Sequence, residues 1–474
     1  MLEFAQLQEK AASTTYDLLV IGWGKAGKTL AKKAASSGKS VAIIERDPKM
    51  YGGTCINVGC LPTKSLVHHG KVVQEAELLG WQPQWAEREQ IWEKALEYKR
   101  KFVAMLNKKN FGLLDNEETA DVYLGVASFV DNHSVRVQMA DGELTINADR
   151  IVINTGATPR LLPIPGADAS DRVMTSEGIL ELDQLPKRLL VIGAGFIGLE
   201  FASYFAAYGS QVDVFQFDGS WLPTEDRDDA EAVAKAIEAQ GIKVHFNTSV
   251  KLFEDVDGAV EATVEGPEGE RTETYDTVLV AAGRVPATEG LNVEASGIEL
   301  GRGGAVVVDE KLRTGVENIW AAGDVKGGPA FTFISLDDSR IIWPQLFGAE
   351  PEKTASHQVS DRVGFATCTF IDPPFARVGM NEKQAEEAGV KYTVKKLPTA
   401  AIPKAHVIDQ TAGHTKVLIA EDDTILGATV FHYEAHEMVN LLTLAIKAKV
   451  PYQMLRDFIY THPTFTESLN DVLA

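Results

Sequence analysis

The chain has 474 residues, of which 45% are hydrophobic and 24% charged, and its formal net charge is -21. At roughly 150 residues per domain, this length corresponds to about three domains. The acidic balance argues against nucleic acid as a partner, because phosphate backbones repel it. No apolar stretch is long enough to cross a bilayer, and the N-terminal segment resembles neither a secretory signal nor a transit peptide. We therefore expect a cytoplasmic protein with no membrane or nucleic-acid partner.

Residues 16–47 and 187–218 share one pattern: a buried strand, a glycine turn, a helix and a second strand. Each turn carries Gly-x-Gly-x-x-Gly, which makes the turn tight and lets the backbone approach a pyrophosphate at the helix N-terminus. One such match is weak, but two in matching contexts predict two dinucleotide-binding βαβ units. The glycines are Gly22, Gly24 and Gly27 in the first fingerprint and Gly193, Gly195 and Gly198 in the second.

The two units differ where the second strand ends. Glu45 in the first can accept hydrogen bonds from a ribose diol, whereas the same offset from Gly193 leads to Gln216. A glutamine neither repels a 2′-phosphate as a carboxylate would nor binds it as an arginine would. Nearby acidic residues outnumber Arg227, the only cation close by in sequence, so the pattern favours NADH and leaves NADPH open.

Two of the three cysteines, Cys55 and Cys60, lie in the segment GGTCINVGCLPTK. A structural metal site is disfavoured, because a closed zinc site needs four ligands and the adjacent His68 and His69 point in different directions on a helix. A structural staple is also disfavoured, because closing so short a loop removes little entropy. A redox dithiol remains.

The surrounding residues suit redox use of this cysteine pair. Gly59 directly precedes Cys60 and allows the distortion that would bring two sulfurs five positions apart into disulfide geometry. A following helix N-terminus and Lys64 would favour thiolate over thiol. The segment thus predicts a reactive dithiol.

Two further segments complete the organisation. Residues 90–114 predict a helix, with Ile91, Ala95, Tyr98, Phe102 and Met105/Leu106 on one packing face. From about residue 348 the pattern changes to strands and helices without a glycine fingerprint, which predicts a third domain. The expected boundaries are 1–155 with 285–347 for a discontinuous first domain, 156–284 for the second, and 348–474 for the third.

These motifs, together with GAGFIG, AAGDV and THPTFTES in the same order, resemble the class I pyridine-nucleotide disulfide oxidoreductases, the family of lipoamide dehydrogenase, glutathione reductase and mercuric reductase. The resemblance runs from Tyr16 to the C-terminus. It implies an α/β fold with two Rossmann-like domains, for FAD and for NAD(P), and a C-terminal α+β dimerisation domain. It also implies that electrons from NAD(P)H reach a Cys55–Cys60 disulfide by way of FAD.

The resemblance assigns roles residue by residue. For FAD it implies contacts at Gly22, Gly24, Gly27, Glu45, Thr54, Lys64, Ala127, Thr155, Gly156 and Asp324. For the nicotinamide cofactor it implies Gly193, Gly195, Gly198, Gln216, Val250 and Gly283.

The same resemblance implies the catalytic residues. Cys60 would face the flavin, with Phe196 as a gate over it, and Cys55 would meet the substrate. A Lys64–Glu200 ion pair would tune the flavin. His462, oriented by Glu467, would move protons for the cysteine pair of the other subunit, so that the active enzyme is a homodimer. No metal site is expected.

The finer resemblance concerns the substrate. No cysteine follows Cys368, which argues against mercuric reductase, since that enzyme carries an extra C-terminal cysteine pair. Segments such as GKAGKTLA and FTFISLDDSRII most resemble the reactive chlorine resistance protein A or hypothiocyanous acid reductase group. This implies reduction of a small oxidant, hypothiocyanous acid, to thiocyanate in oxidative stress defence. The alternatives are a dihydrolipoamide dehydrogenase, a copper(II) or other metal reductase, and a redox-sensing metal-binding flavoprotein that uses Cys55, Cys60 and His68.

Overall fold

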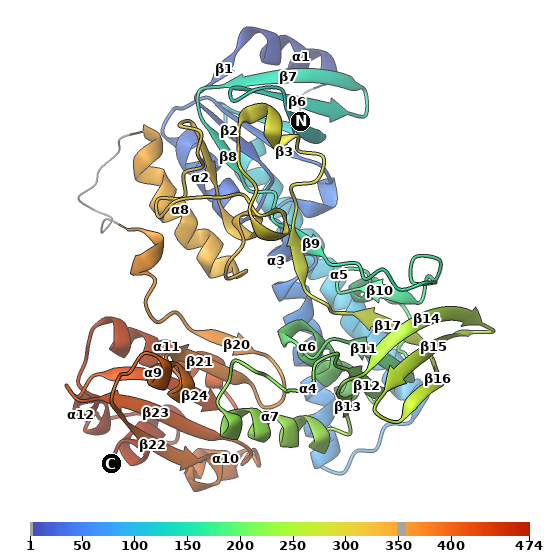
Figure 1. The fold of residues 1–474 in the computed structure, drawn as a ribbon, viewed down its shortest axis with the longest axis vertical. Helices are drawn as coiled ribbons and strands as arrows, with labels where there is room; N and C mark the ends of the chain where they lie inside the picture. The colour runs from blue at the N-terminus through green and yellow to red at the C-terminus, as the bar shows by residue number, and fades with distance from the viewer. Residues whose placement is uncertain (1–2, 348–356) are drawn as a thin grey trace. The chain divides into compact units, whose positions relative to one another are not determined.

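The computed structural model describes residues 3–347 and 357–474 and is shown in Figure 1. The chain forms two compact units. The first comprises Met1–Ser65, Lys94–Arg160 and Gly283–Asp361, and the second comprises Leu66–Glu93, Leu161–Ala282 and Arg362–Ala474. The three-domain boundaries expected from the sequence remain a prediction, and the one at residue 348 lies outside the described residues.

A five-stranded parallel sheet, in the order β19-β8-β2-β3-β4, is the centre of the first unit. Its strands are nearly uninterrupted apolar runs, as strands covered on both faces require. On β2, Leu19 and Ile21 face one core, whereas Leu18 and Val20 face a second core that includes the helices α2 and α8. The elements are β2 (Leu18–Ile21), α2 (Lys25–Ser36), β3 (Val41–Glu45), β4 (Ala120–Leu124), β8 (Ile151–Ile153), β19 (Ile319–Ala321) and α8 (Thr332–Phe347).

A four-stranded sheet, β1-β7-β6-β5, covers the other face. Along β7 buried and exposed residues alternate, so only one side of this sheet faces the core. The N-terminal helix α1 (Phe4–Ser13) adds Leu7 and Ala11 to the same core, and Lys10 pairs with Asp121 at 2.6 Å. The remaining strands of the unit are β1 (Thr15–Tyr16), β5 (Val126–Phe129), β6 (Ser134–Met139), β7 (Gly142–Ala148), β9 (Ala157–Pro159) and β18 (Arg284–Pro286).

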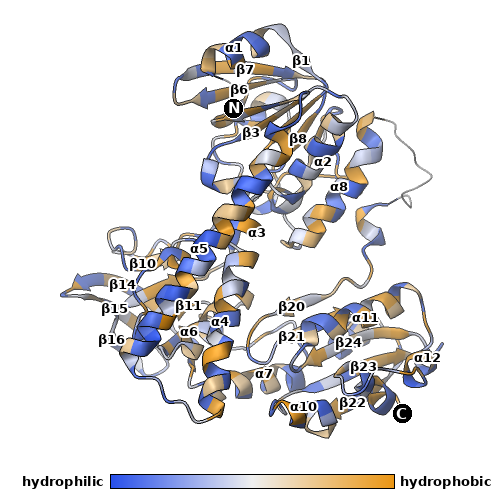
Figure 2. Cartoon of the chain, turned by 180° about the vertical axis from the view of Figure 1, so that it is seen from behind, coloured by the Kyte–Doolittle hydropathy of each residue, from blue (hydrophilic) through white to orange (hydrophobic). Residues whose placement is uncertain are grey.

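The helices α4 (Cys60–Leu78) and α5 (Trp85–Asp115) each contribute residues to both units. The helix predicted over 90–114 is therefore confirmed as part of α5. Its packing face is only partly as predicted: Ala95 is buried, but Tyr98 and Met105 are 56% and 59% exposed. Figure 2 shows hydrophilic and hydrophobic residues mixed along α5. Among the described helices, none combines the length and apolar character that a bilayer span requires.

The second unit contains another parallel sheet, in the order β10-β17-β11-β12-β13. The helix α6 follows β11 after the second glycine turn, and a three-stranded antiparallel sheet, β14-β15-β16, precedes β17. These elements are β10 (Val173–Thr175), β11 (Arg188–Ile192), α6 (Phe196–Ala207), β12 (Gln211–Phe215), α7 (Arg227–Ala239), β13 (Lys243–His245), β14 (Ser249–Val256), β15 (Ala259–Gly266), β16 (Gly269–Tyr275) and β17 (Thr277–Val280).

The C-terminal part of the second unit is an antiparallel sheet, β20-β21-β24-β23-β22, whose core includes residues of α11 and α13. Two parallel sheets, each with a glycine turn after its central strand, together with an α+β part confirm the predicted fold class. The elements here are β20 (Thr367–Thr369), β21 (Phe375–Gly379), α9 (Glu382–Glu387), β22 (Tyr392–Pro398), α10 (Pro403–Val407), β23 (His414–Ala420), β24 (Ile425–Phe431), α11 (Ala435–Lys447), α12 (Tyr452–Arg456) and α13 (Leu469–Val472).

Candidate active site

The first glycine turn joins β2 to α2 and is fixed by Asn154. Gly22 has φ +98°, and a Cβ there would lie 2.5 Å from the Asn154 carbonyl oxygen, so only glycine fits. The Asn154 Oδ1 accepts the Gly27 N–H at 2.8 Å, and its Nδ2 donates to the Ala322 carbonyl at 2.7 Å. Sequence reasoning missed Asn154. A polar residue directly after the apolar strand β8 was the available signal.

Glu45, at the end of β3, holds the same turn from the other side. Its Oε2 accepts the Trp23 N–H at 3.1 Å, and its Oε1 accepts the Arg46 N–H at 2.8 Å. Burial raises the pKa of the Glu45 carboxyl, and these backbone donors oppose the rise. The Glu45 carboxylate thus stabilises the glycine turn. A ribose diol would share this carboxylate with the backbone N–H donors.

The other residues expected to contact FAD belong to the same unit and fit a polar dinucleotide. The Thr155 hydroxyl is buried without a hydrogen-bond partner. Gly156 has φ +75° and no atom within 4 Å of a Cβ placed on it. Burial raises the pKa of Asp324, while Arg284 and Lys326 act against it. A dinucleotide could use all three features. Its sugar hydroxyls could bond to the Thr155 hydroxyl and the Asp324 carboxyl, and its backbone-facing phosphates could approach at Gly156. Ala127 is buried on β5, Thr54 begins α3 (Thr54–Asn57), and Lys64 lies on α4.

One face of α8 connects this turn to the cysteine pair. Thr332, Ser335 and Asp338 are spaced by three residues, so they share one side of the helix. The Ser335 Oγ accepts the Ala26 N–H at 3.1 Å, and the Asp338 Oδ2 accepts the Gly323 N–H at 2.6 Å. Sequence reasoning gave these residues no role, although polar residues at helical spacing in an apolar helix could have indicated one.

The two cysteines lie on consecutive helices. Cys55 is in α3, Cys60 begins α4, and Gly59 separates them. A Cβ on Gly59 would lie 2.9 Å from the Thr54 carbonyl oxygen, so the glycine allows the two helices to approach. The two cysteines are not joined in a disulfide, and Cys60 is exposed whereas Cys55 is partly buried.

The surroundings of the two sulfurs are unequal. The Cys60 Sγ lies 3.6 Å from the Thr332 hydroxyl, at the N-terminus of α8, where the helix dipole favours an anion. The hydrogen bond with Cys60, followed by burial, raises the pKa of the Cys55 thiol. The hydrogen bond with Cys60 and burial thus act against the expected lowering of the thiol pKa at Cys55, whereas Thr332 and Lys28 act in its favour.

The second glycine turn repeats the first with an amide in place of the carboxylate. Gly193 has φ +105°, and a Cβ there would lie 2.7 Å from the Ala281 carbonyl oxygen. The Gln216 Oε1 accepts the Ala194 N–H at 2.8 Å, just as Glu45 accepts the N–H of Trp23. At Gly195 no atom lies within 4 Å of an added Cβ, which leaves room for a phosphate beside the turn.

Polar groups near Gln216 bear on the cofactor choice. The Gln216 Nε2 lies 3.4 Å from the Asp218 Oδ2. The Arg227 Nη2 donates to the carbonyls of Trp221 at 2.9 Å and Leu222 at 2.8 Å. The nearest cation in sequence is thus held by backbone carbonyls.

Three more predicted residues can be placed. Phe196 begins α6 and is 45% exposed, and Val250 is buried on β14. Gly283, with φ +95°, belongs to the first unit.

His462 and Glu467 form a hydrogen-bonded pair, with 2.8 Å between Nδ1 and Oε2. The Glu467 Oε1 also accepts the Thr464 N–H at 3.0 Å, and the His462 side chain is 71% exposed. Although burial opposes it, the hydrogen bond from His462 lowers the pKa of the Glu467 carboxyl. The imidazole is thus oriented, with Nε2 left to exchange protons.

Glu200 lies buried on α6 in the second unit, where its Oε1 accepts the Phe370 N–H at 2.9 Å. Lys64 belongs to the first unit. The Lys64–Glu200 ion pair therefore stays a prediction.

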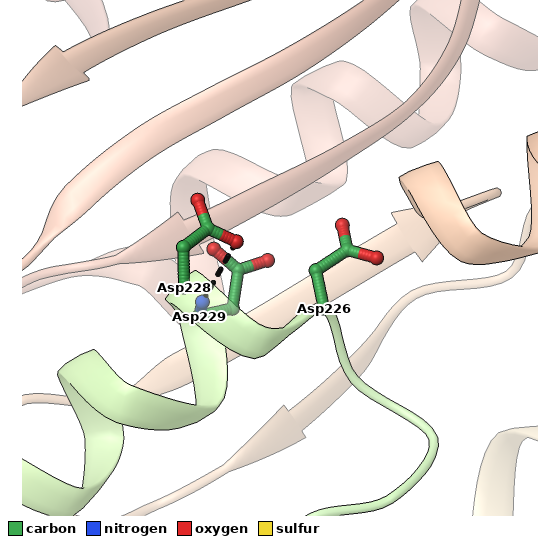
Figure 3. A group of neighbouring side chains, drawn as sticks. All are labelled: Asp226, Asp228 and Asp229. Atoms are coloured by element: carbon green, nitrogen blue, oxygen red, sulfur yellow. Dashed lines mark hydrogen bonds between the residues drawn. The ribbon is translucent and has the colours of Figure 1, made fainter.

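Asp226, Asp228 and Asp229 gather at the start of α7, as Figure 3 shows, and the Asp229 N–H donates to the Asp228 Oδ1 at 2.9 Å. The Lys416 Nζ, from β23, lies 2.8 Å from Asp226, 2.9 Å from Asp228 and 3.0 Å from Asp229. The Lys416 ammonium already bridges these three carboxylates. They form a buried ion network between α7 and the C-terminal sheet.

Known proteins show where this architecture belongs. The pyridine nucleotide-disulphide oxidoreductase profile matches residues 16–338, and the dimerisation domain of the same family matches residues 365–473. The Escherichia coli K12 protein named probable pyridine nucleotide-disulfide oxidoreductase RclA is 41% identical over 97% of this chain and 99% of its own length. A Staphylococcus aureus dihydrolipoyl dehydrogenase is 33% identical over 95% of this chain and 94% of its own.

Solved structures agree with the sequence matches. The Cu(II) complex of HOCl-induced flavoprotein disulfide reductase RclA from Escherichia coli superposes with a TM-score of 0.89 at 40% identity, covering 97% of this chain and 99% of that one. The predicted family is confirmed. With its two glycine turns, its paired cysteines and its C-terminal domain, the chain belongs to the pyridine nucleotide-disulfide oxidoreductases.

Proposed function

We propose that this flavoprotein disulfide reductase uses NAD(P)H to reduce hypothiocyanous acid to thiocyanate. The observation that carries the proposal is the unequal pair of sulfurs: Cys60 is exposed and contacts Thr332 at a helix N-terminus, whereas Cys55 is partly buried. The similarity to RclA, described as HOCl-induced, supports a small electrophilic oxidant as substrate. By removing such an oxidant, the enzyme would serve oxidative stress defence.

Each sulfur has its own task. The Cys55 thiolate attacks the sulfur of hypothiocyanous acid, forming a Cys55–S–SCN adduct and releasing hydroxide, which takes up a proton to become water. The Cys60 thiolate then attacks the Cys55 sulfur, which closes the disulfide and releases thiocyanate. Bound FAD, held by the first glycine turn with Glu45 and Asp324, would supply the two electrons that reopen this disulfide. Glu467 keeps the His462 imidazole in place to supply and remove the protons.

We also propose that the enzyme is a homodimer and that His462 serves the cysteine pair of the other subunit. The match to the family's dimerisation domain supports this. Large apolar side chains near His462 are exposed in the single chain: Met454 is 59% exposed, Phe458 54% and Ile459 93%. Covering them with a second copy would remove a large apolar surface from water.

NADH is the proposed electron donor. Gln216 uses its carbonyl on the Ala194 N–H, and its amide faces Asp218. The Arg227 Nη2 is held by the carbonyls of Trp221 and Leu222. A 2′-phosphate would therefore meet a carboxylate and an arginine that is engaged elsewhere.

Copper(II) is a second candidate substrate, because the relative RclA is described in a Cu(II) complex. Lipoamide is a third, because the dihydrolipoyl dehydrogenase shares 33% identity. All three candidates would use the same sulfurs, so turnover has to be measured with each substrate to distinguish them.

Purified protein with bound flavin decides between these candidates. NADH oxidation is followed with hypothiocyanous acid, lipoamide or copper(II), in the wild type and in Cys55→Ser. We expect rapid turnover with hypothiocyanous acid that Cys55→Ser abolishes while flavin absorbance persists. Turnover with lipoamide alone would assign the protein to the dehydrogenases. A hypothiocyanous acid reaction that survives Cys55→Ser would refute the proposed mechanism.

A further inference from the structure

Lys28 is a buried lysine beside the cysteine segment. It follows Gly27 on α2 and is 7% exposed. Its Nζ donates to the Asn110 Oδ1 at 2.5 Å and to the Gly52 carbonyl at 3.4 Å. Both acceptors are neutral, and among the described residues no carboxylate pairs with this ammonium. A buried ammonium without a counter-ion is costly, so a nearby anion would stabilise its charged form.

The Lys28 Nζ lies 3.4 Å from the carbonyl oxygen of Gly52, three positions before Cys55 in the chain. Gly52 begins the short segment leading into α3, and a Cβ on it would lie 3.1 Å from the Asn110 Cγ and 2.8 Å from the Ile56 Cδ1. The Asn110 Nδ2 donates to the Leu106 carbonyl at 2.8 Å, which directs its Oδ1 to Lys28. The ammonium is thus fixed by α5 and by the segment that precedes Cys55.

The charges of Lys28 and Cys55 act on each other. Burial, and then repulsion from Lys25, lowers the pKa of Lys28 to about 8, and a Cys55 thiolate acts in the opposite direction. The Cys60 hydrogen bond and burial raise the pKa of Cys55, and the Lys28 ammonium lowers it. Each group therefore favours the charged form of the other.

We propose that Lys28 is the counter-ion of the Cys55 thiolate, a positioning residue that acts through Cys55. In the dithiol, Cys55 is hydrogen-bonded to Cys60. Once the proton leaves, the thiolate and the ammonium neutralise each other in a buried site, and this sets Cys55 up as the attacking sulfur. The inference rests on the proposed function in one respect, namely that Cys55 is the sulfur that meets the substrate.

Alkylation of Cys55 tests this without any oxidant or NADH. In a Cys60→Ala background, which removes the second thiol, the rate of Cys55 modification by iodoacetamide is measured from about pH 5 to pH 10 by peptide mass spectrometry. We expect Lys28→Met to slow modification about tenfold at neutral pH, equal to a rise of about one pKa unit. Lys28→Arg should restore most of the rate. Lys32→Met is the matched control, because Lys32 is on the same helix and pairs with Glu117.

The outcomes separate cleanly. An unchanged alkylation profile in a Lys28→Met protein that keeps its flavin would overturn the proposal. If the Lys28 variants fail to fold, the parent Cys60→Ala protein decides: a Cys55 pKa at or above the ordinary value of about 8.5 would also overturn it. Because no substrate is used, failure of hypothiocyanous acid reduction would refute the proposed function and leave this result standing.

Discussion

The two glycine fingerprints make the same backbone hydrogen bond with different side chains. Glu45 accepts the N–H of Trp23 at 3.1 Å, and Gln216 accepts that of Ala194 at 2.8 Å. Around the first turn, Asn154 and Ser335, both neutral, bind backbone N–H groups. In the second unit, by contrast, charged residues make the contacts: Lys416 on β23 pairs with Asp226 and Asp229 at the start of α7.

This difference teaches that the residue after the second strand has two tasks. It closes the glycine turn in both units, which either an amide or a carboxylate can do. It also selects the ribose, which depends on its charge. The glycine turn requires a side chain of this length with an acceptor oxygen at its end. It does not require a charge, so the charge at this position can differ with the cofactor that is bound.

The largest expected effect comes from filling either turn. Gly22→Ala and Gly193→Ala would each place a Cβ within 2.7 Å of a carbonyl oxygen at positive φ. Gly22→Ala should yield protein without flavin. Gly193→Ala should keep flavin and lose NADH binding, which flavin absorbance and NADH titration measure.

Gly195→Ala is the control for these variants, because no atom lies within 4 Å of its added Cβ. It should keep the wild-type melting temperature and raise only the KM for NADH. Flavin loss in Gly193→Ala would show that the two turns are not independent.

Lys416→Met tests the buried ion network between α7 and the C-terminal sheet. It leaves Asp226 and Asp229 buried without their ammonium, so the free energy of unfolding should fall by about 3–5 kcal/mol. Chemical denaturation measures this. Lys396→Met, which removes a partly exposed partner of Asp228, should cost less than about 1 kcal/mol. Equal costs for the two variants would contradict a buried network.

Gln216→Glu isolates the charge of the strand-end residue. A glutamate should keep the Ala194 hydrogen bond and repel a 2′-phosphate. We expect kcat/KM for NADPH to fall about tenfold, or about 1.4 kcal/mol, with that for NADH changed little. Steady-state kinetics with both cofactors measures the ratio. A parallel loss with NADH and NADPH would mean that the turn itself has been disturbed.

The smallest effect is a difference in pH dependence. Despite burial, hydrogen bonds from Lys396 and Lys416 lower the pKa of Asp228, so its stabilisation is present above its unfolded pKa of about 3.9 and is lost as pH falls. The raised pKa of Glu45 has the opposite sign, because that contribution is lost as pH rises. Because Asp228 is partly exposed, Asp228→Asn should change acid stability by less than about 1 kcal/mol. Melting temperatures over a pH series measure it, and an Asp228→Asn protein with steeper acid loss than wild type would contradict the sign.

Much of this architecture could be predicted from local sequence. The glycine spacing and the apolar strands predict both parallel sheets, because tight turns and strands covered on both faces leave strong local signals. The Cys55–Cys60 pair also stands out in the local sequence, because its two cysteines lie only five positions apart, and its redox role stays a prediction.

What the sequence could not reveal depends on contacts between distant segments. Asn154, Ser335 and Lys416 each act on residues more than a hundred positions away. Tyr98 and Met105 matched an apolar helical face but are exposed, because a single helix pattern does not say which side meets a neighbour. Thr332 is a further case, because it lies 272 positions after Cys60 in the sequence but 3.6 Å from its sulfur.

The most direct test of the central claim is an anaerobic titration. Protein reduced with one equivalent of NADH receives hypothiocyanous acid in substoichiometric steps, with thiols, thiocyanate and the Cys55–Cys60 disulfide quantified at each step. The account predicts one disulfide and one thiocyanate for each oxidant molecule, and no disulfide in Cys55→Ser. Thiocyanate release with both thiols intact would contradict it.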